Sequence, residues 1–590
     1  MAPRSRSPLR RWVPAVDWLS RYDRRDLPSD LVAGLVVAIM LVPQGMAYAM
    51  LAGLPPQVGL YASVVPVALY ALFGTSTSLA VGPVALVSLL VASGVSQLAQ
   101  AGTPAYLSYA LTLALLVGVV QAAMGAIRLG FLANFLSHAV LSGFTSAAAL
   151  VIAASQLKHV LGVAIEGQES FFGLLAALVT KLPQASPAAV AIGIGGVLTL
   201  LAFRHAAQPA LERVGVPGPW RVPLSKVGPF VAVAGGAWVT YRFSLHDIAG
   251  VTIVGDIPRG LPSLTLPALD LGAWRVLLPT ALAISFIGFV ESFAVAKVLA
   301  ARRREKVRAN QEVFALGVAN LGAAFTGGYP VTGGFSRSMV NFTAGARSGL
   351  AAVVTAVLVA LSLAFLTPLF FFLPKASLAA IILVAVAQLI DVGAFYRFWL
   401  YSRADAVAFL VTFAAVLLTG VERGIAVGAL AALLLHLWRT TQPHVAVVGR
   451  VGQTEHYRNV LRHRVRTWPS LLLMRVDESL YFANAQYLEN RVLRAVADRP
   501  QVEHFVLIAS AVNFIDGSAL ETLETLRDEL ASAGVTFHLA EVKGPVMDRL
   551  RRVSFLRGMG EGKVFLSTDE AVEALVGASR PTQVIKGAFA

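Results

Sequence analysis

The stretch YPVTGGFSRSMV (Tyr329–Val340) interrupts an apolar part of the chain with two glycines, a serine and an arginine. The chain has 590 residues, of which 56% are hydrophobic and only 14% are charged. Runs such as 31–51 and 105–127 have the roughly 17–25 apolar residues that span a bilayer as a helix. Irregular backbone at membrane depth is tolerated only where it is buried in protein or lines a cavity. The stretch therefore predicts a functional site inside a polytopic membrane protein.

The composition excludes several classes of function. No cysteine is present, which excludes disulfides, thiolate metal sites and cysteine catalysis. The sequence has no nucleotide-binding glycine loop and no His/Asp/Glu cluster with metal-ligand spacing, so we expect no enzyme, no cofactor and no metal site. The net charge of +15 is explained by basic loops facing anionic lipid, and we expect no nucleic-acid partner. No cleaved signal peptide is expected at the basic N-terminus.

Hydropathy predicts how the chain divides. Long apolar segments dominate as far as Trp438, after which charged residues become frequent. We expect an N-terminal segment over 1–29, a transmembrane domain over 30–440, a soluble domain over 445–577 and a tail over 578–590. Fourteen apolar segments are predicted in the first part, at 30–52, 56–73, 83–97, 105–127, 131–161, 186–204, 225–243, 276–301, 310–327, 335–345, 348–372, 376–392, 404–419 and 421–438.

Loop charge indicates how these segments are oriented. If the N-terminus is cytoplasmic and the segments alternate, 20 Arg and Lys residues fall on the cytoplasmic side and 7 on the other. Basic residues concentrate in cytoplasmic loops, so this asymmetry predicts an even number of crossings. We therefore expect a multi-pass protein of the plasma (inner) membrane with both termini in the cytoplasm. The cluster RRREKVR (Arg302–Arg308) is its strongest topological anchor.

The apolar part contains an internal repeat. VAIMLVPQGMAYAMLA can be laid over ISFIGFVESFAVAKVLA, which brings Gln44 opposite Glu291. A Gly-Pro break at Gly82 follows Gln44 after 38 residues, and a Gly-Gly break at Gly333 follows Glu291 after 42 residues. Because seven segments precede the second copy, the two copies enter the membrane in opposite directions. Matched interrupted segments in an inverted repeat indicate the binding site of a transporter.

Each broken segment is predicted to be a short strand that leads into a half-helix, with Pro83 at the first helical position of the first one. The first amides of a helix have no intrahelical partner, and the helix dipole adds about half a positive charge. Two such helix ends that face each other would bind an anion mainly through the backbone. The residues expected to line this site are Gln44, Tyr48, Val84, Ala85, Phe335, Ser336 and Arg337.

Three of these side chains, and Glu291 on the second copy of the repeat, have more than one interpretation. Arg337 could extend to the membrane interface instead, Ser336 could cap its half-helix, and Tyr48 suits core packing as well as site lining. A carboxylate inside a membrane is costly and usually functional, so Glu291 is a candidate carrier of a coupling proton. The alternative is a permanent structural pair of Glu291 with Arg337 or Lys297.

Four stretches of the chain resemble the SulP anion transporters, the sulfate permease group. They are LVPQGMAYAMLAGLPPQVGLY (Leu41–Tyr61), GTSTSLAVGPVALVSLL (Gly74–Leu90), VGDIPRGLP (Val254–Pro262) and GGYPVTGGFSRSMVNFTAGAR (Gly327–Arg347). The resemblance implies fourteen transmembrane helices in two inverted seven-helix repeats, a core domain that moves against a gate domain, a cytoplasmic α/β STAS domain and a homodimer. It also implies that Gln44, Tyr48, Glu291, Ser336 and Arg337 match site positions of the family, with Glu291 as the proton-coupling residue.

The resemblance favours a secondary active transporter of small inorganic anions. The VGPVALVS and GGFSRSMVN forms look closest to sulfate-type members, so sulfate–proton symport by an elevator-like movement is our first hypothesis. Bicarbonate or dicarboxylate transport and chloride exchange are the alternatives, although FIGFVESFAVA lacks the threonine and aspartate expected of a sodium site. A non-transporting anion sensor that signals through the STAS domain is a hypothesis of a different class.

The soluble part predicts a sheet with helices packed on it. LLLMRV (Leu471–Val476) and HFVLIAS (His504–Ser510) have the pattern of buried strands, and 517–534 has that of an amphipathic helix. Ser518 resembles the phosphorylatable serine of anti-sigma-factor antagonists, but Gly517 stands where a second hydroxyl is common. We therefore expect Ser518 to cap or pack rather than to be phosphorylated. A cytoplasmic protein could bind this domain.

Overall fold

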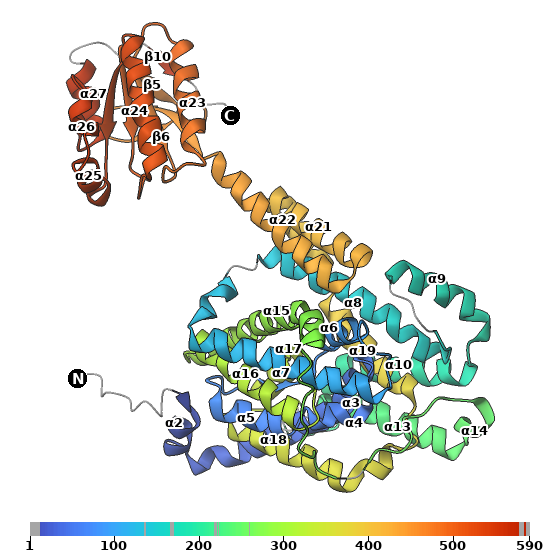
Figure 1. Ribbon diagram of the computed structural model, residues 1–590. Coiled ribbons are helices and arrows are strands. Elements are labelled where there is room, and N and C mark those ends of the chain that lie inside the picture. Colours follow the sequence, from blue (N-terminus) through green and yellow to red (C-terminus); the bar gives the residue numbers. More distant parts are fainter. Residues whose placement is uncertain are drawn as a thin grey trace. The chain divides into compact units, whose positions relative to one another are not determined.

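The computed structural model describes residues 12–134, 137–165, 170–217, 221, 224–258, 260–576 and 583–585. The chain forms two compact units that divide between Ala432 and Leu433 (Figure 1). Of the predicted N-terminal segment, residues 1–11 lie outside the described residues. Gly577, the expected end of the soluble domain, and all of the predicted tail except 583–585 also lie outside them.

Each of the fourteen predicted segments contains a helix. Proline and capping side chains explain several of the starts: Thr103 and Ser186 accept hydrogen bonds from the first turns of helices that begin at Pro104 and Pro187. The helices are α3 (Leu27–Leu51), α4 (Pro56–Tyr61) with α5 (Val65–Phe73), α6 (Ala85–Val95), α7 (Pro104–Ala126), α8 (His138–Leu161), α10 (Pro187–His205), α13 (Gly228–Arg242), α15 (Leu271–Arg303), α16 (Ala309–Phe325), α17 (Phe335–Thr343), α18 (Leu350–Leu361), α19 (Lys375–Val386), α21 (Arg403–Thr419) and α22 (Val421–Thr441).

Length separates these helices into two kinds. Nine helical stretches within the described ranges are long and apolar enough to cross a membrane. The predicted segments that fall short of that length are α6, α13, α16, α17 and α21. Two of these, α6 and α17, are the half-helices expected from the broken segments. The architecture is that of a polytopic helical membrane protein, and it is consistent with fourteen spans.

The two sequence repeats of the first unit do not fold separately. Helices from both repeats pack together in two groups. In one group α7 packs against α15 and α16, and α3 packs against α17 and α18 (Figure 1). In the other group α8 packs against α19 and α21, while α10 packs against α13 and α19. The helix α22 joins this second group because Gly424 and Gly428 let it approach Val416 and Thr412 of α21 closely. We call the first group the core domain and the second the gate domain.

The two broken segments meet inside the core domain. Strand β1 (Val81–Gly82) pairs antiparallel with β2 (Thr332–Gly333), with Val81 opposite Gly333 and Gly82 opposite Thr332. Segments some 250 residues apart therefore run side by side in opposite directions, as two inverted copies must. This short sheet confirms the inverted repeat predicted from the offsets of the glycine breaks.

The second unit is an α/β domain. Its sheet has the order β10 (Gln583–Ile585), β5 (Val465–Thr467), β3 (Val445–Arg450), β6 (Leu471–Val476), β7 (His504–Ile508), β8 (Thr536–Ala540) and β9 (Val564–Phe565), with β6 to β9 parallel. The helices α23 (Ala485–Ala497), α24 (Gly517–Ser532) and α27 (Thr568–Val576) pack on it. Both predicted strands and the predicted helix are confirmed, with ends that differ by no more than two residues.

Ser518 does not cap helix α24, so this prediction was wrong. The capping residue is Asp516, whose Oδ1 accepts a hydrogen bond of 2.8 Å from the amide of Ala519. A carboxylate at this position also interacts favourably with the helix dipole, which a serine hydroxyl does much less. Ser518 lies in the first turn and is exposed.

Candidate functional site

Both half-helices begin directly after the paired strands. Val84 has extended backbone with φ −137° and ψ 150°, and α6 begins at Ala85. Gly334 is likewise extended with φ −99° and ψ 128°, and α17 begins at Phe335. The first helix thus starts two residues later than the predicted Pro83, because the chain stays extended as far as Val84, beyond the paired residues. The first amides of each half-helix have no partner within their own helix and are free to bind a ligand.

Buried hydrogen bonds hold β2 against the long helix α15. The hydroxyl of Ser292 accepts from the amide of Gly333 at 2.8 Å, and the hydroxyl of Thr332 donates to the carbonyl of Gly288 at 2.7 Å. On the neighbouring helix α16, Asn320 bonds both the amide and the carbonyl of Val331. These bonds satisfy irregular backbone that could not be hydrated at membrane depth.

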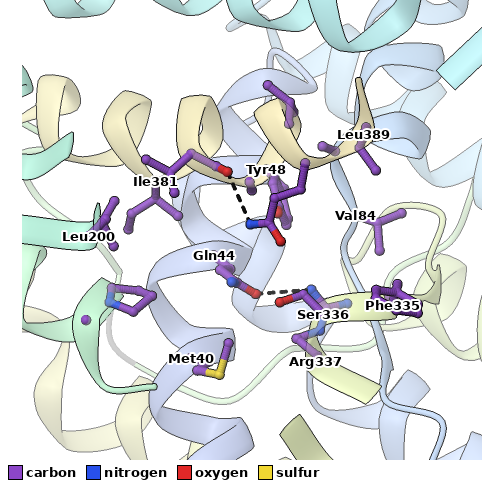
Figure 2. A pocket seen from close by; sticks show the side chains of 18 of the residues that line it. Met40, Gln44, Tyr48, Val84, Leu200, Phe335, Ser336, Arg337, Ile381 and Leu389 are labelled. Carbon is purple, nitrogen blue, oxygen red and sulfur yellow. Dashed lines mark hydrogen bonds between the residues drawn. The ribbon is translucent and has the colours of Figure 1, made fainter. Parts of the chain in front are cut away.

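All eight membrane-domain site residues predicted from the sequence line one cavity of about 340 Å³ (Figure 2). Gln44 and Tyr48 come from α3, Val84 and Ala85 from the start of α6, and Phe335, Ser336 and Arg337 from the start of α17. Glu291 reaches the same cavity from α15. The structure brings the predicted residues together, and their role in binding remains a prediction.

Arg337 is the principal positive charge of this cavity. Its side chain is buried, with a relative exposure of 2%, so it does not extend to the membrane interface. Nη1 donates a hydrogen bond of 3.4 Å to Oε1 of Gln44, as Figure 2 shows. Within the described part of the chain, Nε and Nη2 are buried without a hydrogen-bond partner. A buried guanidinium with unused donors is costly unless something else binds it, and an anion in the cavity would do so.

Glu291 is the negative charge of the same cavity. Its Oε2 is buried and finds no hydrogen-bond partner among the described residues. No ion pair joins Glu291 to Arg337 or to Lys297 in the described ranges, so the structure does not contain the permanent pair considered above. Two opposite charges therefore line one cavity without neutralising each other directly.

The gate domain supplies the wall that the sequence analysis missed. Apolar residues such as Leu200 on α10 and Ile381 on α19 face the half-helices (Figure 2). Hydropathy could not identify them, because an apolar residue that lines a cavity looks the same as one that faces lipid. Two cations, Arg204 at the end of α10 and Lys226 before α13, also line the cavity. In the sequence they look like ordinary basic loop residues.

Comparison with known proteins identifies the family. A family model described as the sulfate permease family matches residues 27–412, and a STAS domain model matches residues 462–571. Probable sulfate transporter 4.2 of Arabidopsis thaliana is 36% identical over 590 residues, covering 97% of this chain and 85% of that protein. A probable sulfate transporter of Mycobacterium tuberculosis is 35% identical over 565 residues, covering 95% of this chain and 98% of that protein.

Solved structures have the same fold. Murine solute carrier 26 family member A9, an anion transporter in an inward-facing state, superposes with a TM-score of 0.86 at 25% identity, covering 96% of this chain and 95% of that one. The transmembrane domain of a cyanobacterial bicarbonate transporter superposes with a TM-score of 0.57 at 23% identity, covering 70% of this chain and 98% of that one.

The fold, the paired half-helix ends and these likenesses define a multi-pass membrane transporter of anions. The chain belongs to the sulfate permease family, and it carries a STAS domain after its membrane part. Because this family consists of transporters, the protein is not an enzyme.

Substitution of Gly82 is expected to damage the site. Gly82 has φ +152°, which other residues rarely adopt, and a Cβ there would lie 3.3 Å from Cδ1 of Leu41 and 3.4 Å from Nη2 of Arg337. We expect Gly82→Ala to destabilise the protein by about 1–3 kcal/mol and, because the backbone at the end of β1 must shift, to alter the start of the first half-helix. Thermal unfolding with and without sulfate measures both effects.

The matched control for this substitution is Gly102→Ala. Gly102 has φ +87°, but nothing lies within 4 Å of a Cβ added there. The control should lose stability through backbone strain while keeping the stabilisation that sulfate gives the wild type. If Gly82→Ala keeps that stabilisation as well, Gly82 does not shape the site.

Proposed function

We propose that the protein is a sulfate–proton symporter that works by an elevator-type alternating-access mechanism. The observation that carries the proposal is the pair of half-helix N-termini that meet beside the open guanidinium of Arg337 in one cavity. Amides, a hydroxyl and a guanidinium are all donors, and they suit the oxygen atoms of a tetrahedral oxyanion. The names of the relatives, sulfate transporters of plants and mycobacteria, favour sulfate among such anions.

Glu291 is proposed to carry the coupled proton. It shares the cavity with the proposed anion, and no described residue neutralises its Oε2. A dianion and a carboxylate in one cavity repel each other, whereas protonation of Glu291 removes one of the two charges. Anion binding and proton binding therefore favour each other. Uptake should rise as the pH on the uptake side falls.

The elevator movement is supported by how the cavity is built. The core domain contributes the half-helices and Glu291, and the gate domain contributes the apolar wall. The β1–β2 pair joins both half-helices, so the binding groups can move past the gate domain as one body. The likeness to a solved inward-facing anion transporter supports the same conformation for this chain.

We propose a homodimer in the plasma (inner) membrane with both termini in the cytoplasm. The domain limits are proposed as 30–440 for the transporter and 445–577 for the STAS domain, which offers a surface for a cytoplasmic protein.

Transport by reconstituted protein tests the proposed function. Purified full-length protein is placed in proteoliposomes, and uptake of radiolabelled sulfate and bicarbonate is measured with and without pH and sodium gradients. We expect saturable sulfate uptake that an inward proton gradient stimulates and a sodium gradient does not. Sodium-driven bicarbonate uptake would assign the alternative substrate, and anion binding without any uptake would assign a sensor.

Glu291→Gln is expected to remove the proton coupling. The amide has nearly the shape of the carboxyl group but does not titrate in this range, so sulfate uptake should no longer respond to a pH gradient. Exchange of internal for external sulfate should continue, because it needs no net proton movement. Glu305→Gln, just after the end of α15 and outside the cavity, is the control. A pH response in Glu291→Gln equal to that of the wild type would exclude this role.

Arg337→Gln is expected to weaken sulfate binding. Hydrogen bonds to charged groups contribute about 1.5–3 kcal/mol, which corresponds to a rise in KM of roughly ten- to a hundredfold. Arg204→Gln is the contrasting variant, because Arg204 also lines the cavity but is exposed. Its effect should be smaller and should decrease as salt is added, since salt screens exposed charges. An unchanged sulfate KM in Arg337→Gln would show that this charge does not bind the substrate.

A further inference from the structure

Two buried serines outside the cavity lining connect the half-helices across the repeat. Ser88 on α6 is fully buried, and its hydroxyl donates to the carbonyl of Val84, the residue before the helix, at 2.8 Å. The same oxygen lies 2.9 Å from the hydroxyl of Tyr329. Because the serine proton is used on Val84, the tyrosine donates. Tyr329 belongs to the chain that leads into β2, so this bond joins the first half-helix to the second strand.

Ser338 on α17 makes the corresponding connection in the other direction. It too is fully buried, and its hydroxyl donates to the carbonyl of Gly334 at 2.7 Å. It accepts a hydrogen bond of 2.9 Å from the amide of Ala80, in the chain that leads into β1. This bond joins the second half-helix to the first strand.

The two arrangements are related by the inverted repeat. Each serine lies four residues after the last extended residue, Val84 or Gly334, and bonds the carbonyl of that residue. The same hydroxyl also bonds a residue just before the strand of the other repeat, which is Tyr329 for Ser88 and Ala80 for Ser338. We call these two bonds, Ser88–Tyr329 and Ser338–Ala80, the cross-repeat bonds.

We propose that Ser88 and Ser338 are positioning residues that fix the spacing of the two half-helix N-termini and thereby determine the affinity and size selectivity of the anion site. The inference rests on the proposed function, in which these N-termini bind the transported anion. Neither serine lines the cavity, so neither is assigned a contact with the anion.

The geometry explains why the spacing depends on these bonds. The sheet of β1 and β2 has only two residue pairs, and besides the cross-repeat bonds the amide of Gly334 donates to the carbonyl of Ala80 and Nδ2 of Asn341 donates to the carbonyl of Ser78. A bond from each helix to the opposite strand helps to keep the half-helices from splaying on both sides of the sheet. Backbone amides recognise an anion by distance, so a wider spacing weakens the contacts to all of its oxygens at once.

The experiment measures sulfate uptake by full-length protein in proteoliposomes for Ser88→Ala, Tyr329→Phe, Ser338→Ala and the double variant Ser88→Ala/Tyr329→Phe. We expect each single variant to raise the sulfate KM roughly three- to tenfold, as the loss of one net hydrogen bond implies, with little change in the maximal rate per folded protein. Size-exclusion chromatography gives the folded fraction. The double variant should resemble Ser88→Ala, because that substitution already breaks the bond to Tyr329.

Selectivity gives a second readout. Selenate is a larger tetrahedral dianion than sulfate, so a wider site should discriminate less against it. The ratio of the selenate inhibition constant to the sulfate KM should therefore fall in all of these variants. Ser63→Ala is the control: Ser63 is fully buried, but among the described residues its hydroxyl bonds only the carbonyl of Gly59, four residues before it. It should change neither KM nor the ratio.

The outcomes separate this inference from the proposed function. If the wild type takes up no anion, the proposed function fails and the inference with it. If the wild type is active and the variants keep its KM and selectivity, only the inference is overturned. A fall in maximal rate per folded protein, with KM unchanged, would also overturn it, because that result means that the bonds affect turnover and not anion binding. Tyr329→Phe removes only a hydroxyl and keeps the aromatic ring in the core. It therefore tests the bond even if the serine variants fail to fold.

Discussion

Unpaired backbone at membrane depth is the constraint on which the rest of this structure depends. Two segments of the chain stop being helical inside the apolar part. Every amide and carbonyl that they expose needs a hydrogen-bond partner there. The protein meets this need in part by pairing the two breaks with each other as antiparallel strands. The amides left over at Ala85 and Phe335 then face a cavity instead of lipid. The proposed anion site is formed by these unpaired amides.

The charges of the site follow from the same constraint. A cavity lined by amide donors attracts an anion, and Arg337 strengthens that attraction. Its guanidinium fits close to the strands because glycines stand at 82 and 334, where a Cβ would come within 3.4 Å of it. Without a ligand, a buried positive charge needs some negative charge nearby. Glu291 supplies it without a direct pair, which leaves both groups available to their proposed ligands.

Much of this arrangement could be predicted from the sequence, because it rests on local signals. Glycine and proline at matched offsets revealed the repeat, and polar residues in apolar helices revealed Gln44, Glu291 and Arg337 as candidates. Two kinds of feature could not be predicted. The gate-domain residues that line the cavity, such as Leu200 and Ile381, are apolar like their neighbours in the sequence. Nothing in the sequence distinguishes them from residues that face lipid. The cross-repeat bonds depend on which strand lies opposite which helix, and only the three-dimensional structure shows that Ser88 faces Tyr329.

The polar contacts also suit the proposed movement of the core domain against the gate domain. Within the core domain, buried bonds tie β2 to α15 and α16, and tie each half-helix to the opposite strand. Between the domains, Glu422 of α22 accepts hydrogen bonds from Thr280 of α15 at 2.6 Å and, more weakly, from Gln97 at 3.5 Å. Around the cavity the gate wall is mainly apolar, and apolar surfaces can slide without leaving donors unpaired. A movement of the proposed kind would therefore break the contacts at Glu422 and keep those that shape the site. The geometry of the proposed anion site would then stay the same while the anion crosses the membrane.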